Sequence, residues 1–158
     1  MLTTRQRYLA AITNHWGGMN LGSFAQRLLL QKRIFFVSML GVSLGFGHSW
    51  YIRGPYSPTL TRDSYAVEGA RMKSNIATVT LPDSLSKKLD DIRNMFGAAW
   101  NDPQRMELLA SVCYLARTLR TNNSDYLSDK LVSRKGHFTK DQATEAFDWL
   151  ADKGLING

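Results

Sequence analysis

Residues 23–40 read SFAQRLLLQKRIFFVSML. The first four residues have the form of a capping box, in which the Ser and Gln side chains satisfy free amides of a first helical turn. The helix that this pattern predicts stops at Gly41. Its apolar side chains fall on several faces: Leu28, Ile34, Phe35, Val37 and Met39. Because a helix that is apolar nearly all round is usually central in its domain, we expect here the core helix of the first half of a mainly α protein.

Helical signals continue on both sides of this segment. Capping boxes begin at Thr3 and Thr139, Ser57-Pro58 opens a helix expected to end near Gly69, and Pro82-Asp83 and Pro103 open two more. Apolar spacing places helices over residues 4–15, 58–67, 83–96, 103–121, 125–133 and 139–152. Residues 49–52 suggest a short extended segment, Gly54-Pro55 a turn, and residues 71–81 a linker with a short strand.

Length and composition describe a soluble, compact chain. With 158 residues it fits an N-terminal unit over 1–81 and a C-terminal unit over 82–158, or one continuous helical domain. The most apolar run, Leu28 to Leu40, is interrupted by polar residues and falls short of the roughly 20 residues of a membrane span. No apolar signal-peptide core follows Arg5 and Arg7, and the single cysteine fits a reducing compartment. We therefore expect a cytoplasmic protein without membrane contact.

Positive charge is concentrated in the first half of the chain. The net charge is +7, and no Asp or Glu occurs between Met1 and Arg62. That stretch holds seven basic residues: Arg5, Arg7, Arg27, Lys32, Arg33, Arg53 and Arg62. Such asymmetry points to a polyanion or an acidic protein as partner. The alternative is a solvated basic face that only keeps the protein soluble.

Catalytic patterns are sparse. The three histidines, His15, His48 and His137, fall in different predicted segments, and the chain lacks Cys-x-x-Cys, a phosphate loop and a dinucleotide fingerprint. Cys113 lies on the apolar stripe of its helix, so we expect a buried structural thiol. We predict no metal, no cofactor and no enzymatic activity. An enzyme whose catalytic groups converge from distant positions remains the alternative.

The nine residues from Trp50 to Pro58 combine three aromatic residues, one arginine and a Gly-Pro pair. Aromatic rings beside an arginine can stack on bases or on a peptide. The structural alternative is that Gly54-Pro55 fixes a turn, Ser57 caps a helix with Pro58 in its first turn, and Trp50 and Tyr56 fill the core. We favour the structural role for these two aromatic residues and leave Arg53 open.

The C-terminal helices followed by Lys153-Gly154-Leu155-Ile156 look like a helix-turn-helix core that enters the wing of a winged helix. In a DNA-binding version the last helix would enter the major groove. This helix, however, carries Asp141, Glu145, Asp148 and Asp152. Because phosphate would repel it, we expect it to pack within the protein or in a homodimer.

Several of these motifs together resemble a known family. Leu30-Gln31-Lys32 with Phe35-Phe36, then Trp50-Tyr51, Gly54-Pro55-Tyr56-Ser57-Pro58 and Leu60 are similar to the SocA-like antitoxin family, also called Panacea, and its YwgA-like branch. The similarity covers residues 23–67, and residues 143–156 also resemble the YwgA-like branch. It implies a small, helical, non-catalytic protein found beside toxins or in phage and plasmid conflict genes, in its best-known type an adaptor that delivers a toxin to a protease. The N-terminal helix and the basic first half depart from the antitoxin pattern.

These observations lead to one function and two alternatives. We expect a non-catalytic binding protein of a bacterial or phage conflict system, either toxin–antitoxin or antiphage defence, that contacts nucleic acid or a nucleoprotein complex. The expected contacts are Arg5, Arg7, Arg27, Lys32, Arg33, Tyr51 and Arg53, with structural roles for Trp50, Gly54, Pro55, Tyr56, Ser57 and Pro58. The first alternative is a protein-binding antitoxin or proteolytic adaptor that recognises an acidic toxin. The second is the enzyme with dispersed catalytic groups.

Overall fold

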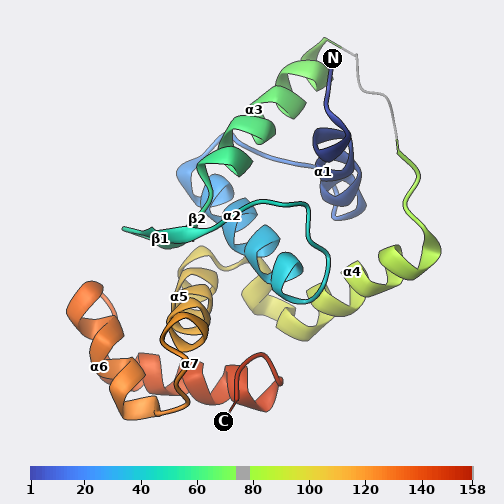
Figure 1. Ribbon diagram of the computed structural model, residues 1–158. Helices are drawn as coiled ribbons and strands as arrows, with labels where there is room; N and C mark the ends of the chain where they lie inside the picture. The colour runs from blue at the N-terminus through green and yellow to red at the C-terminus, as the bar shows by residue number, and fades with distance from the viewer. Residues whose placement is uncertain (74–78, 158) are drawn as a thin grey trace.

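The fold is mainly helical, as predicted. The computed structural model describes residues 1–73 and 79–157, and in them seven α-helices accompany one 3₁₀ helix and one two-stranded antiparallel sheet. The elements are α1 (Thr4–His15), α2 (Phe24–Met39), β1 (Ser49–Tyr51), β2 (Gly54–Tyr56), α3 (Pro58–Met72), α4 (Asp83–Phe96), η1 (Gly97–Asn101), α5 (Pro103–Leu119), α6 (Ser124–Arg134) and α7 (Lys140–Asp152). In Figure 1, α1 and α3 lie at one end, α6 and α7 at the other, and α2 and α5 between them.

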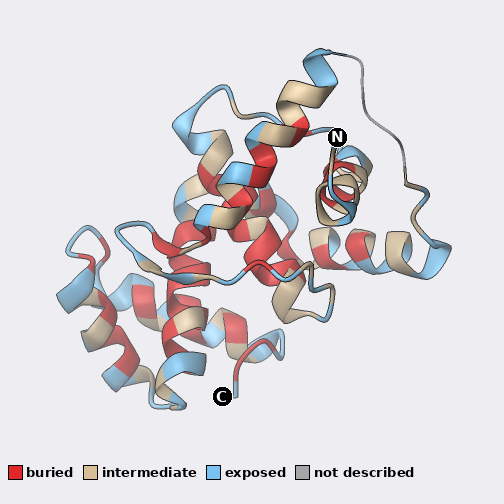
Figure 2. Ribbon diagram, turned by 45° about the horizontal axis from the view of Figure 1, so that its top comes forward, coloured by how far each residue is buried: buried red, intermediate tan, exposed pale blue. Residues whose placement is uncertain are grey.

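Helices α2 and α5 form the centre of the molecule, and Figure 2 shows that both are largely buried. The Ser23 hydroxyl caps α2 by accepting a hydrogen bond from the Gln26 amide, and the Asp102 carboxylate caps α5. The central position predicted for the helix over residues 23–40 is thus confirmed. One apolar cluster runs from Leu9 in α1 to Leu150 in α7, so residues from 1–81 and from 82–158 share a single core.

Capping signals located the helix starts well. The reciprocal capping boxes at Thr3 and Thr139 are both present, and α3 begins after the Ser57 cap with Pro58 in its first turn. The expected end of α3 near Gly69 is wrong, because the helix continues to Met72. A glycine within a helix costs only about 1 kcal/mol, and the packing of α3 against α1 offsets it. Most of the short strand suggested for residues 71–81 falls on 74–78, outside the described residues.

The Gly-Pro pair is not a turn but a strand. In the hairpin, Ser49 pairs with Tyr56, Trp50 with Pro55 and Tyr51 with Gly54, so the turn is Ile52-Arg53. A proline is tolerated here because each strand of a two-stranded sheet has a free edge. Gly54 has a φ of +90°, a conformation that a residue with a Cβ adopts only at a cost. Glycine and proline therefore mark a constrained strand beside α5 rather than the reversal of the chain.

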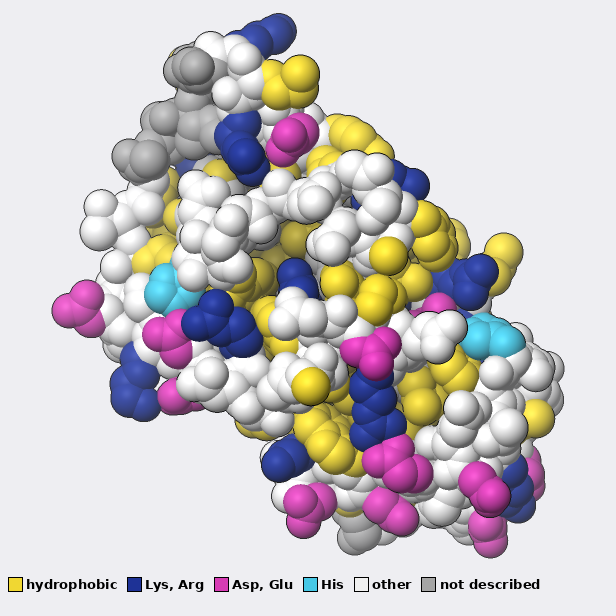
Figure 3. All heavy atoms as spheres, turned by 180° about the vertical axis from the view of Figure 1, so that it is seen from behind, with side chains coloured by type: hydrophobic (Ala, Val, Ile, Leu, Met, Phe, Trp, Pro, Cys, Tyr) yellow, Lys and Arg dark blue, Asp and Glu magenta, His cyan; other side chains and the backbone are white. Residues whose placement is uncertain are grey.

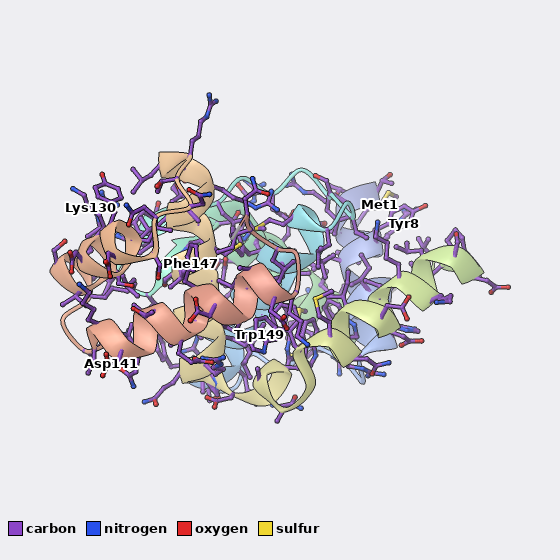
Figure 4. All side chains as sticks on the ribbon, turned by 90° about the horizontal axis from the view of Figure 1, so that it is seen from below. Met1, Tyr8, Lys130, Asp141, Phe147 and Trp149 are labelled. Atoms are coloured by element: carbon purple, nitrogen blue, oxygen red, sulfur yellow. The ribbon has the colours of Figure 1, made fainter. Side chains whose placement is uncertain are left out.

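The C-terminal end consists of α5, α6 and α7 without a wing strand in the described residues. After α7, the Leu155 amide bonds to the Leu150 carbonyl and Arg117 donates to the Leu155 carbonyl, 3.0 Å away. This fold-back buries Leu155 and Ile156 against the core. Figure 4 shows α7, marked by Asp141, Phe147 and Trp149, lying beside α6. The acidic Glu145 of α7 bonds to Arg105 of α5 at 2.8 Å, consistent with the predicted packing role.

None of the helices in the described ranges has both the length and the apolar composition needed to cross a lipid bilayer.

Candidate functional site

A pocket of about 340 Å³ lies between α2, the hairpin and the first turns of α3. Residues spaced three and four apart give α2 one face toward it: Phe24, Arg27, Leu28, Gln31 and Lys32. The hairpin contributes Tyr51, Ile52, Arg53 and Tyr56, and α3 contributes Thr61 and Tyr65. Five of the seven aromatic and basic side chains around this pocket, those at positions 27, 32, 51, 53 and 56, were singled out in the sequence.

Hydrogen bonds fix the elements that form this pocket. The Gln31 side chain is buried, donates to the Ser57 carbonyl at 3.0 Å and to the Thr61 hydroxyl at 2.9 Å, and accepts from the Ser57 amide at 2.9 Å. The Tyr56 and Thr61 hydroxyls lie 2.6 Å apart. Because these bonds connect α2, the hairpin and α3, the pocket does not need a ligand to bring its parts together.

Exposed apolar side chains gather around the pocket. The described part of the chain exposes seven large apolar side chains, and four of them line it: Phe24, Tyr51, Ile52 and Tyr65. Single exposed apolar residues are common on protein surfaces, whereas a cluster around a concavity marks an interaction site. We therefore take this aromatic pocket as the candidate functional site.

Lys32 is the unusual group of the pocket. Its side chain is buried on the pocket wall, and its Nζ donates to the Pro55 carbonyl at 2.7 Å. Burial, together with the nearby charge of Lys135, lowers the pKa of Lys32 to about 7, although Glu107 acts in the opposite direction. The folded chain thus carries a lysine that is partly neutral near physiological pH.

The Lys32 charge predicts a specific dependence of stability on pH. Between the folded pKa of about 7 and the ordinary value of 10.5, the unfolded chain binds more protons, so the contribution of Lys32 to stability rises with pH. Below this window both states are protonated and the full cost of the buried charge is present. We expect Lys32→Met to be more stable than the wild type near about pH 6, and this advantage to shrink toward about pH 9 by at most about 1.4 kcal/mol per pH unit.

Urea denaturation across this pH range measures the effect. Lys87→Met is the matched control, since Lys87 is an exposed lysine on α4 that pairs with Asp91. Its difference from the wild type should stay flat between about pH 6 and about pH 9. A constant difference for Lys32→Met as well would show that Lys32 titrates normally in the folded protein.

A buried carboxylate anchors the hairpin from behind. The Glu107 carboxylate of α5 lies 2.7 Å from His137 Nε2, 3.5 Å from Lys135 Nζ and 3.8 Å from Arg53 Nη1. Lys135 also donates to the Ile52 carbonyl. Burial lowers the pKa of Lys135, against the opposing effect of Glu107. This Glu107 cluster therefore connects the hairpin turn to α5 and to the segment between α6 and α7.

Other predicted contact residues are used inside the protein. Arg5 donates to the buried Asp63 at 2.8 Å and lies over the Phe46 ring. Arg33 donates to the Trp100 carbonyl at 3.1 and 2.8 Å, and burial lowers its pKa to about 10. The half-buried Arg7 has a buried Nε without a hydrogen-bond partner among the described residues. Lys32, another predicted contact, is buried on the wall of the pocket rather than on the open surface.

The remaining basic residues do not merge into one stripe on the face shown in Figure 3. There, Lys and Arg side chains are scattered in ones and twos, while acidic side chains gather toward the lower end, where α6 and α7 lie. Of the predicted contacts, Arg27, Lys32, Tyr51 and Arg53 line the pocket, and Lys32 is the buried one among them. Arg27 also donates to the Leu21 carbonyl at 2.9 Å.

The residues of the Gly-Pro motif mainly contact other parts of the protein. Trp50 packs against the core and lies under the cations of Arg134 and Lys135. Gly54, Pro55 and Ser57 are buried, and the Ser57 hydroxyl caps α3 ahead of Pro58. Tyr56 has a double role, because it bonds to Thr61 and also lines the pocket.

Sequence reasoning missed Phe24, Gln31, Ile52, Thr61 and Tyr65 in the pocket, and Glu107, Lys135 and His137 behind it. The face spacing of α2 was a usable signal for Phe24 and Gln31. Glu107 could have been noticed as a lone carboxylate in the apolar run of α5, since such a residue is rarely buried without a partner. Lys135, His137 and Tyr65 had no such signal, because only the fold brings them together with the others.

In the described ranges, the His, Cys, Asp and Glu side chains do not form a metal site or a reactive-thiol site apart from the pocket. Among the described residues, no group of three or more His, Cys, Asp or Glu side chains has a metal-binding arrangement. Cys113 is buried, as predicted, and burial raises the pKa of its thiol to about 12. Burial, with the charge of Lys32, lowers the pKa of His48 to about 4.

Comparisons of the chain with models of protein families, with curated proteins and with solved structures found no match. The resemblance of residues 23–67 to the SocA-like family therefore stays a prediction, and the geometry of the aromatic pocket carries the functional inference.

Proposed function

We propose that this protein is a non-catalytic binding protein that seats an apolar side chain of a protein partner in the aromatic pocket. The observation that carries the proposal is the gathering of four exposed large apolar side chains around one pocket that also holds Arg27 and Arg53. Tyrosine and arginine are enriched among the residues that dominate binding energy at protein interfaces. A preformed pocket adds affinity because little ordering is needed on binding.

A protein partner accounts for the basic residues better than a polyanion does. Binding that depends on phosphate contacts requires several free cations, whereas Arg5 and Arg33 serve internal contacts and Lys32 is buried. In the setting that the family resemblance implies, the protein works in the cytoplasm as an antitoxin or adaptor, and its partner is an acidic toxin. The products of neighbouring genes are therefore the partners to test first.

Tyr51→Ala tests this proposal. Co-expression with the neighbouring gene products should yield one stoichiometric protein complex. Removing the Tyr51 ring should weaken the complex by about tenfold or more, because interface tyrosines often contribute above about 1.4 kcal/mol. Isothermal titration calorimetry on the purified partners gives the dissociation constants, and thermal unfolding of each variant alone checks that the fold is retained.

Tyr126→Ala is the matched control. Tyr126 lies on α6 away from the pocket and is 44% exposed, close to the 46% of Tyr51. We expect its loss to leave the affinity nearly unchanged. Equal effects of the two substitutions, or none from Tyr51→Ala, would contradict a role of the pocket in partner binding.

A second candidate, single-stranded nucleic acid, is favoured by one contact. The Arg53 guanidinium lies over the Phe24 ring at 5.5 Å, beside the exposed Tyr51, and exposed rings next to arginine can stack on unpaired bases. Anisotropy with labelled DNA and RNA single strands tests this reading. It predicts binding that falls steeply between about 50 and 200 mM salt and that Tyr51→Ala weakens. An absence of binding at low salt excludes it.

A further inference from the structure

We propose that the partner group that enters the aromatic pocket carries a carboxylate, and that this carboxylate is recognised by the cations of the pocket, with Lys32 as the deepest of them. The inference rests on the proposed function and adds to it the chemistry of the group that is bound. It concerns the charge of the ligand, whereas the proposed function concerns the apolar body that the aromatic side chains receive.

The charges around the pocket are unbalanced. Arg27, Lys32 and Arg53 line it, and none of the described residues that line it is acidic. The nearest carboxylates already have partners of their own. Asp63 accepts from Arg5 and Gln6, and Glu107 lies against Lys135 and His137 as well as Arg53. A negatively charged group in the pocket would therefore meet an excess of positive charge.

Lys32 forms no ion pair within 4 Å among the described residues, although the charge of Glu107 acts on it from farther away. The carbonyl of Pro55 is its hydrogen-bond partner, 2.7 Å from Nζ, although an ammonium group has three donors. A buried cation is costly unless it is paired and hydrogen-bonded. A ligand carboxylate supplies both an opposite charge and further acceptors, so binding would relieve a cost that the protein bears without it.

The walls fit an apolar body attached to that carboxylate. Phe24, Tyr51 and Tyr65 are exposed rings at the pocket, and Tyr56 is held in place by its bond to Thr61. Aromatic side chains bury large areas and prefer edge-to-face contacts with other rings. A phenylalanine side chain next to a carboxylate, from a chain end or from a neighbouring acidic residue, combines both requirements.

Carboxylate binding should be accompanied by proton uptake. Because the pKa of Lys32 is held near 7, an opposite charge beside it would raise this pKa and draw a proton from solution at about pH 8. The other charged or titratable groups near Lys32 come from the elements packed around it: Arg27 of α2, His48 before β1, Arg53 and Tyr56 of the hairpin, Glu107 of α5 and Lys135 after α6. Among the six, His48 has a pKa near 4 and so is neutral at this pH.

Three short peptides test the proposal on the 158-residue chain. They are N-acetyl-Gly-Phe with a free carboxylate, N-acetyl-Gly-Phe-amide and N-acetyl-Glu-Phe-amide. Calorimetry at about pH 8, in two buffers of different ionisation enthalpy, gives the affinity and the number of protons taken up. We expect one of the two charged peptides to bind about tenfold or more tightly than the neutral amide. Tighter binding of N-acetyl-Gly-Phe would indicate that the pocket binds the carboxylate of a chain end. Tighter binding of N-acetyl-Glu-Phe-amide would indicate that it binds an acidic side chain.

Lys32→Met separates charge from shape. Methionine is unbranched and apolar, so it fills the same space without the amine. We expect this variant to lose the proton uptake and most of the preference for the charged peptide, since Arg27 and Arg53 remain at the pocket, while it retains binding of the neutral amide. Lys87→Met, which removes an exposed lysine of α4, should change neither quantity. The proton uptake of the wild type is an independent measurement if the Lys32 variant folds poorly.

Equal affinities for charged and neutral peptides would overturn the inference, as would a preference that is undiminished in Lys32→Met. The absence of binding by all three peptides would overturn it too. None of these results decides the proposed function, because that is judged by the effect of Tyr51→Ala on the complex with the protein partner.

Discussion

Replacing Gly54 with alanine is expected to lower the free energy of unfolding by about 3 kcal/mol or more. A Cβ at this position would stand 2.4 Å from the Ser111 hydroxyl of α5, and the φ of +90° is strained for any residue with a side chain. Ser111 is fully buried, so its hydroxyl has little room to move away. Urea denaturation followed by circular dichroism measures the loss.

Substitutions at Gly45, Gly47 and Ser111 separate the two causes of this loss of stability, which are backbone strain and overlap with the Ser111 hydroxyl. Gly45 has a φ of +83° and no atom within 4 Å of the point where a Cβ would lie, so Gly45→Ala reports backbone strain alone, about 1–2 kcal/mol. Gly47 has neither the strained φ nor a neighbour, so Gly47→Ala should change stability little. In a Ser111→Ala background, the cost of Gly54→Ala should fall toward that of Gly45→Ala. An unchanged cost there would show that the hydroxyl is not what excludes a side chain.

Replacing Glu107 with glutamine is expected to destabilise the protein by about 3–5 kcal/mol, because it leaves the buried charge of Lys135 without its partner. Glutamine keeps the size of the side chain, so the loss reports charge rather than packing. Urea denaturation at neutral pH again gives the free energy. Asp91→Asn is the control, since it neutralises a carboxylate in an exposed pair with Lys87 and should cost less than about 1 kcal/mol.

A second substitution identifies the charge that is left unpaired. Lys135→Met in the Glu107→Gln background should restore much of the lost stability, because a neutral Gln–Met pair of similar volume leaves no uncompensated charge at these two positions. If the double variant is as unstable as Glu107→Gln, the loss comes from His137, Arg53 or Lys32 instead, and the corresponding variants at those positions identify which one.

Much of the fold could be predicted from local chemistry. Ser, Thr and Pro at helix starts, with helical apolar spacing after them, located α1, α2, α4, α5 and α7 closely, because caps and apolar stripes act within one helical turn. The end of α3 was missed, since its packing on α1 outweighs the weak helix preference of Gly69. Strand β1 matches the extended segment expected over residues 49–52, whereas β2 was missed for a related reason. A Gly-Pro pair suggests a turn unless a neighbouring helix, here α5, requires close backbone approach.

The candidate site was only half visible in the sequence. Aromatic and basic residues near the Gly-Pro pair pointed to Tyr51 and Arg53, which do line the pocket. Charge counting, however, cannot tell an exposed arginine from Arg5 or Arg33, whose partners Asp63 and Trp100 are distant in the chain. It also cannot show that Lys32 is buried, because this depends on where α5 and the hairpin lie relative to α2.

The bond from Lys135 to the Ile52 carbonyl joins residues 83 positions apart, and this has a consequence for long-range communication. The segment between α6 and α7 holds one wall of the aromatic pocket through this bond, so we expect a shift of those helices to change the affinity of the pocket. If the two are coupled in this way, thermodynamic reciprocity requires that a ligand in the pocket changes the free energy of local unfolding of α6 and α7 by the same amount. Hydrogen exchange at α6 and α7 is thus a remote reporter of what the pocket binds, and a macromolecule bound at that end acts as an allosteric effector of it.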